Sequence, residues 1–146
     1  MFFKKPFFTD SQKLSLVEAI TLAEAMTSGE IRVHTEAKCK AEDTATRATE
    51  VFFKLKMNQT AQKNGVLIYL AYEDKKFAIM GDEGINAVVP ATFWDGTKEV
   101  MRGHFQQGEF YEGVIFAVQE TGFHLKQYFP LLNGDKNELT NELSEE

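Results

Sequence analysis

Residues 64–90 constrain the fold of this chain more than any other stretch. They begin with a continuous apolar run at 66–71, pass through a charged turn and return in a second short run at 77–80. Short runs rich in β-branched and aromatic residues, bounded by glycine and charge, are typical of a β-hairpin. A turn centred on Asp74 and Lys75 gives antiparallel partners whose residue numbers sum to about 149.

This pairing predicts that Gly65 lies opposite Gly84 and that Leu67 lies opposite Asp82. The two open ends of the hairpin then meet. The loop before Asn64 comes close to the acidic, glycine-containing loop that follows residue 80, and the sequence therefore predicts a site at this end of the sheet.

The residues before the hairpin have the pattern of a strand followed by a helix, which would connect that strand to the first strand of the hairpin. In residues 30–36, apolar Ile31 and Val33 alternate with charged or polar neighbours, as in a half-buried strand. Asp43 can cap a following helix that carries one apolar face. A strand, a helix and a strand in this order make a crossover, so we expect residues 30–36 to run parallel to 66–71 and the third strand to run antiparallel to both.

Three further helices complete the predicted architecture. One follows a capping box at Thr9 and Gln12, a second covers residues 93–105, and a third covers residues 110–128. We expect an α/β fold: a three-layer α/β/α sandwich with a short mixed central β-sheet of three to four strands. The expected divisions are an apolar arm at 1–8, a single domain at 9–132 and an acidic, mobile tail at 133–146.

Charge and composition exclude some classes of protein. The chain has 146 residues, with 22 acidic and 16 basic side chains and a net charge of −6, which disfavours a nucleic-acid surface. No run of about 18 apolar residues is present, so we expect no integral membrane segment. The N-terminus lacks the pattern of a signal peptide, and we expect a monomeric, cytoplasmic protein of bacterial type.

Oxygen-bearing side chains gather at the end of the sheet where the hairpin opens. Oxygen donors between glycines are what Ca²⁺ or Mg²⁺ requires. The candidate metal ligands are Glu30, Thr60, Asn64, Asp82 and Glu83, and the glycines that let the loop turn inward are Gly81 and Gly84. The alternative is that Asp82 and Glu83 form an ordinary solvated turn. His34 is expected to be an exposed strand residue, and zinc is disfavoured because no HxxxH or HExxH spacing occurs.

Several motifs, taken in order, resemble one known family. They are SGEIRV at 28–33, NGVLI at 64–68, FAI at 77–79, GDEGI at 81–85, FW at 93–94, Phe105 with GEF at 108–110, and NEL at 137–139. Together they resemble the TPM domain family, over residues 11–142. The resemblance implies an α/β/α sandwich with a pair of loops that cross at one end of the sheet and bind divalent cations. These loops correspond to residues 57–64 and 81–90 here. Asn64, Gly81, Asp82 and Gly84 match the family pattern, whereas Glu30, Thr60 and Glu83 are added on geometry.

Three functions remain open from the sequence. The first is a metal-responsive binding or regulatory module, in which one or two cations, Ca²⁺ first and Mg²⁺ second, order the crossing loops. The second is a metal-dependent acid phosphatase, because some relatives are described as such. The third is a protein-interaction module that uses the N-terminal phenylalanines without a metal. The sequence does not identify a protein partner.

Overall fold

The central feature of the molecule is a mixed four-stranded sheet. The computed structural model describes residues 7–131 and 137–146. Within them the strands are β1 (Glu30–Glu36), β2 (Gly65–Ala71), β3 (Lys76–Gly81) and β4 (Ser144–Glu145), in the spatial order β3-β2-β1-β4. β1 pairs in parallel with both β2 and β4, and β3 pairs antiparallel with β2. The predicted crossover and the direction of the third strand are both confirmed.

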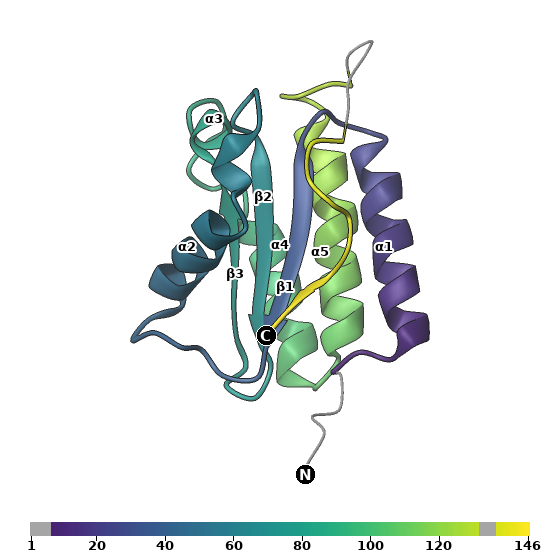
Figure 1. Ribbon diagram of the computed structural model, residues 1–146, viewed down its shortest axis with the longest axis vertical. Helices are drawn as coiled ribbons and strands as arrows, with labels where there is room; N and C mark the ends of the chain where they lie inside the picture. Colours follow the sequence, from purple (N-terminus) through teal and green to yellow (C-terminus); the bar gives the residue numbers. More distant parts are fainter. Residues whose placement is uncertain (1–6, 132–136) are drawn as a thin grey trace.

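Helices cover both faces of this sheet, so the predicted α/β/α sandwich is confirmed. α2 (Thr44–Lys54) lies on one face, and α1 (Asp10–Glu24), α4 (Asp95–Gln106) and α5 (Phe110–Leu125) lie on the other (Figure 1). A short 3₁₀ turn, η1 (Met57–Gln59), follows α2, and a one-turn helix, α3 (Glu83–Asn86), follows β3. α3 is an element that the sequence did not predict.

Capping side chains fix where two of the helices begin. Thr9 and Gln12 form the reciprocal capping box that starts α1. The Asp43 carboxylate accepts a hydrogen bond from the Thr46 amide at 2.8 Å and starts α2. Both caps lie where the sequence placed them.

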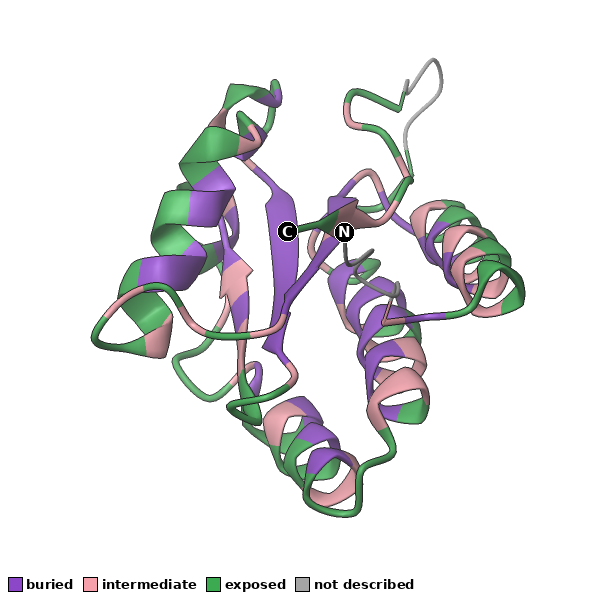
Figure 2. Cartoon of the chain, turned by 60° about the horizontal axis from the view of Figure 1, so that its bottom comes forward, coloured by how far each residue is buried: buried purple, intermediate pink, exposed green. Residues whose placement is uncertain are grey.

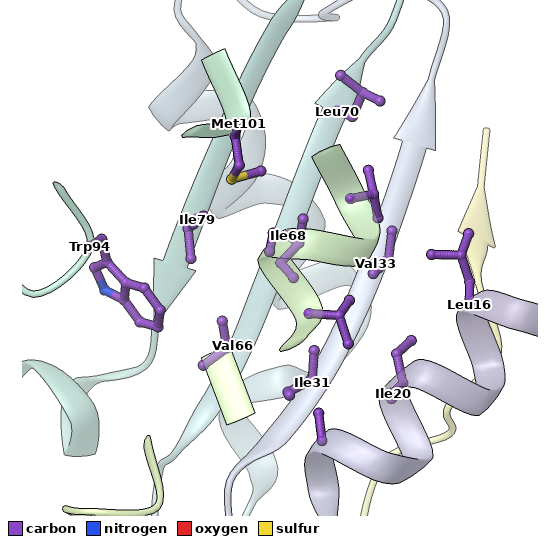
Figure 3. Packing of buried hydrophobic residues seen from close by; sticks show 14 of the residues in the cluster. Leu16, Ile20, Ile31, Val33, Val66, Ile68, Leu70, Ile79, Trp94 and Met101 are labelled. Carbon is purple, nitrogen blue, oxygen red and sulfur yellow. The ribbon is translucent and has the colours of Figure 1, made fainter. Parts of the chain in front are cut away.

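The sheet separates two apolar clusters. The larger one lies under α1, α4 and α5, and Figure 3 shows Ile31, Val33, Ile68 and Ile79 pointing together from three strands on this face. The smaller one lies under α2 and includes Phe52 and other buried residues: Ala48, Val51, Met57, Leu67, Tyr69 and Ala71. Because both its faces are covered, β2 is buried along its whole length, whereas β3 is only partly buried (Figure 2).

The predicted register of the hairpin is wrong by two residues. Val66 lies opposite Gly81 and Leu67 lies opposite Met80, so Gly65 does not face Gly84 and Leu67 does not face Asp82. The last pair of the ladder is Ala71 with Lys76, so the turn occupies residues 72–75, and Lys75 adopts the left-handed conformation with φ 53°. A shift of two keeps every side chain on its predicted face.

Both ends of the chain contribute to the domain. Of the expected arm at 1–8, residues 1–6 lie outside the described residues, but Phe8 is buried in the larger cluster and Phe7 stacks on Tyr72 with ring centroids 3.8 Å apart. The expected domain end at residue 132 lies outside the described residues. In the expected tail, residues 137–146 run back along the sheet and form β4, because β1 offers them an open edge (Figure 1).

Candidate functional site

Two loops cross at the end of the sheet where β2 begins and β3 ends. The Gly84 amide donates to the Lys63 carbonyl at 2.9 Å, and the Asp82 amide donates to the Gly65 carbonyl, also at 2.9 Å. A Cβ atom on Gly84 would lie only 2.3 Å from the Gln62 carbonyl oxygen. Glycine at this position therefore allows the backbones to approach, and the predicted meeting of loops 57–64 and 81–90 is observed.

Three of the predicted ligand residues are buried at this crossing. Thr60 and Asn64 come from the first loop and are 2% and 1% exposed, and Asp82 comes from the second and is 8% exposed. The Thr60 hydroxyl accepts a hydrogen bond from the Asn64 amide at 3.2 Å, which fixes the shape of the first loop. The Asn64 side-chain NH₂ donates to the Ser28 hydroxyl at 3.3 Å. The other polar atom of this side chain is the amide oxygen Oδ1.

Two side-chain oxygens at the crossing have no hydrogen-bond partner. Asp82 Oδ1 accepts from the Glu83 amide at 2.8 Å and caps α3, but Asp82 Oδ2 has no partner among the described residues. The same is true of Asn64 Oδ1. A buried oxygen without a partner costs about 1–3 kcal/mol, and more when it carries charge. A cation bound to either oxygen would remove its share of this cost.

Gly81 and Asn86 brace the second loop. The Asn86 side chain donates to the Gly81 carbonyl at 3.1 Å, across the single turn of α3. Gly81 packs against the buried Ile85 side chain, which a Cβ atom would approach to 3.2 Å. Gly81 therefore serves close packing, whereas Gly84 serves the crossing itself.

Two of the predicted ligands, Glu30 and Glu83, have other surroundings for their carboxylates. The Glu30 carboxylate accepts hydrogen bonds from the backbone amides of Glu138 and Leu139, so it binds the C-terminal segment. Burial raises the pKa of Glu30, and these amides oppose the rise only in part. Glu83 lies in the first turn of α3 with an exposed side chain. Thr60 and Asn64 thus lie in the first loop of the crossing, and Asp82 lies in the second.

A second acidic cluster lies at β1, against the C-terminal segment. His34, Glu36 and Glu146 each place one possible ligand atom within 4.8 Å of the others, so this cluster could hold a metal ion. His34 is 2% exposed, and the expectation of an exposed histidine is wrong. Its two ring nitrogens lie 2.9 Å from the Ser144 hydroxyl and 3.2 Å from Glu36, because β4 covers that side of β1.

Arg47 already neutralises this second cluster. Its guanidinium donates to both Glu36 oxygens, at 2.9 and 2.7 Å, and to Glu146 at 2.7 Å. Burial acts to raise the pKa of Glu36, but the bonds from Arg47, Tyr69 and His34 outweigh it and lower the pKa to about 2. Burial also lowers the pKa of His34. A metal would have to displace an arginine from a buried bidentate pair, so this cluster ranks below the loop crossing as a cation site.

The sequence reasoning missed Arg47, Glu36 and Glu146 as a network. A local signal existed, since Arg47 precedes Ala48 on the inward face of α2, and Glu36 lies on the strand face that α2 covers. Two charges on facing buried surfaces indicate an ion pair. No local signal places Glu146 beside them.

The fold and the crossing define a class of protein: an α/β/α domain in which two loops cross at one end of its sheet. The TPM domain matches residues 4–122, and the chain belongs to the TPM domain family. A similar solved structure is the NMR structure of BA42 protein from the psychrophilic bacterium Bizionia argentinensis, with 44% identity, a TM-score of 0.91 and complete coverage of both chains.

A more distant structure shows the fold alone. The N-terminal domain of cg2496 protein from Corynebacterium glutamicum shares 14% identity, with a TM-score of 0.62 over 84% of each chain. The comparison with curated proteins gives no match. Within residues 7–131 and 137–146, no helix is long and apolar enough to cross a bilayer.

Proposed function

We propose that this domain binds a divalent cation between its crossing loops and acts as a metal-responsive binding or regulatory module. The observation that carries the proposal is the pair of buried, unpartnered oxygens, Asp82 Oδ2 and Asn64 Oδ1. The two atoms belong to different loops, which are already joined by the bond from Gly84 to Lys63. A cation bound to both would hold the loops together a second time.

The donors favour a hard cation. Both are oxygens, one from a carboxylate and one from an amide, and oxygen ligands suit Ca²⁺ and Mg²⁺ rather than the softer metals. Ca²⁺ accepts 6–8 oxygens in irregular arrangements, so backbone carbonyls and water would complete its shell. Mg²⁺ keeps several waters and needs stricter geometry, so we rank it second. One pair of oxygens supports one ion at this site.

The proposed response to the cation is an ordering of the loops. Without a cation, hydration of the buried Asp82 Oδ2 atom would lower the free energy. This favours a state in which the two loops separate and water enters the crossing. With a cation, the closed arrangement is stabilised. Cation binding and loop order are therefore linked, and a partner that recognises the closed loops would respond to the metal concentration.

Binding is proposed in preference to hydrolysis. A phosphatase needs a nucleophile or a positioned water beside the metal. The hydroxyls of Thr60 and Ser28 accept hydrogen bonds from amide groups of the first loop, and among the described residues neither bonds to a carboxylate or histidine that could act as its base. A metal-dependent acid phosphatase is the alternative.

The test is a cation titration of the metal-free protein, followed by backbone amide NMR. Ca²⁺ and then Mg²⁺ are added to the wild type, to Asp82→Asn and to the matched control Glu83→Gln, which removes the same charge from the next residue. Asparagine still caps a helix, so α3 keeps its start. We expect shifts at residues 60–64 and 81–86, at least about tenfold weaker binding in Asp82→Asn, and little change in Glu83→Gln. Flat spectra at millimolar cation, or equal losses in both variants, would refute the proposal.

A further inference from the structure

The free edge of β3 lies at the bottom of a groove. β3 ends the strand order β3-β2-β1-β4, so among the described residues one of its edges pairs with nothing. The Asp82 amide bonds Gly65, and hydrogen-bonded pairs alternate along an antiparallel ladder. The backbone N–H and C=O groups of Phe77 and Ile79 therefore point away from β2, toward this edge.

Helices α2 and α4 form the two walls of the groove, which has a volume of about 500 Å³. Ala45 and Thr49 of α2 stand on one side, and Trp94, Lys98 and Arg102 stand on the other. β3 runs between α2 and α4, as Figure 2 shows. Side chains from both faces of β3 line the space, so the strand edge itself is its floor.

Charge in the groove is opposite to that of the whole protein. Its lining includes two cations, Lys98 and Arg102, and no carboxylate, although the chain has a net charge of −6. Arg102 is paired with Glu99 and lies over the Phe77 ring at 5.6 Å. Lys98 forms no ion pair within residues 7–131 and 137–146. An incoming segment with carboxylates would find a free cation on the α4 wall.

We propose that this groove binds an extended, acidic segment of a partner protein, which adds to the sheet as a fifth strand beside β3. Unpaired backbone groups along a strand edge supply the hydrogen bonds of such an addition, and pockets beside the edge select alternate side chains. The apolar wall residues receive apolar side chains of the segment, and Lys98 receives a carboxylate. The two helices flank the strand edge, which limits open-ended association.

The probes are pools of synthetic peptides of about eight residues, a usual strand length. Alternate positions hold mixed Val, Ile, Leu and Phe, and the positions between them hold Glu in one pool and Lys in another. A third pool repeats the Glu peptides with N-methylated backbones, which cannot donate hydrogen bonds. In amide NMR of the full chain, we expect the Glu pool alone to shift Phe77 and Ile79 and to slow the hydrogen exchange of their amides.

Variants locate the binding. Lys98→Glu should weaken binding of the Glu pool several-fold. The matched control Lys126→Glu, at the residue that caps the end of α5 outside the groove, should not. Ala45→Phe, at an exposed position of α2, fills the groove without a change of charge and should also abolish binding. The proposal is overturned if no pool shifts β3, if the Lys or N-methylated pool binds equally well, or if β3 shifts on dilution because it pairs with a second copy of the chain.

Discussion

Replacing Gly84 by alanine tests the crossing of the loops directly. The added methyl group would lie 2.3 Å from the Gln62 carbonyl oxygen and 2.5 Å from that of Lys63. Both are backbone atoms, which cannot rotate away as a side chain would. The loops would have to separate by about 1 Å to restore an ordinary contact of 3.4 Å.

The expected cost follows from that separation. Overpacking of this kind costs about 1–3 kcal/mol, and we expect the upper end because neither oxygen can yield. Gly103 is the matched control, since it lies within α4 and an added Cβ atom would have no neighbour within 4 Å. Gly103→Ala should stabilise the protein by about 0.5–1 kcal/mol through its helix propensity.

The assay is urea unfolding of wild type and both variants, followed by fluorescence. Trp94 is the one tryptophan of the chain and is buried in the larger apolar cluster, so its emission reports loss of the fold. Gly84→Ala should also lose the response to Ca²⁺. Surface substitutions usually change the free energy of unfolding by no more than about 0.5 kcal/mol. If Gly84→Ala changes it by no more than that, the loops do not cross as tightly as described above.

Three further predictions concern buried charge. Asn64→Asp adds a second buried carboxylate to that of Asp82, so this variant should bind Ca²⁺ more tightly and be less stable without it. Weaker Ca²⁺ binding than in the wild type, measured by titration, would contradict this. Arg47→Met should cost about 3–5 kcal/mol at pH 7 by leaving the buried Glu36 carboxylate without the cation that neutralises it. The pKa of Glu36 is lowered to about 2 in the folded wild type. The stability that this carboxylate gives is therefore present above pH 4.5 and lost as the pH falls toward 2. Urea unfolding at pH 3 should show a smaller difference in the free energy of unfolding between the wild type and Arg47→Met than at pH 7. Burial, reinforced by the nearby Glu30, raises the pKa of Glu24 to about 8, so the wild type should lose stability as the pH rises from 4.5 to 8. Glu24→Gln should remove that loss in thermal unfolding, and equal pH slopes would contradict it.

Local patterns predicted most of the fold. Residues 30–36 form the expected strand because apolar side chains alternate there, and Asp43 caps α2 because its carboxylate reaches a free amide of the first turn. The hairpin was predicted, but its register was not. The turn places Lys75 in the left-handed region at φ 53°, where glycine or asparagine is more usual, so the local sequence does not indicate its position.

The part of the candidate site that could be predicted lies in the loops next to the two paired strands of the hairpin. Asn64 and Asp82 flank the two strands of the hairpin, so the topology brings their loops together even with the register wrong by two. Glu30 also begins a strand at this end of the sheet. Its carboxylate, however, accepts a hydrogen bond from the Glu138 amide, 108 residues later in the sequence. The acidic composition of that segment indicated a free tail, whereas its pairing with β1 and its contact with Arg47 depend on the completed fold.

The pairing of β4 with β1 also bears on how the chain is made. His34 and Ser144 are neighbours in the sheet although 110 residues separate them. A ribosome adds about 5–20 residues per second, so β1 waits roughly 5–20 s for this partner. During that time the edge of β1 is open, and the Arg47–Glu36 pair lacks Glu146. The edge strand therefore closes the sheet as a late, non-local step.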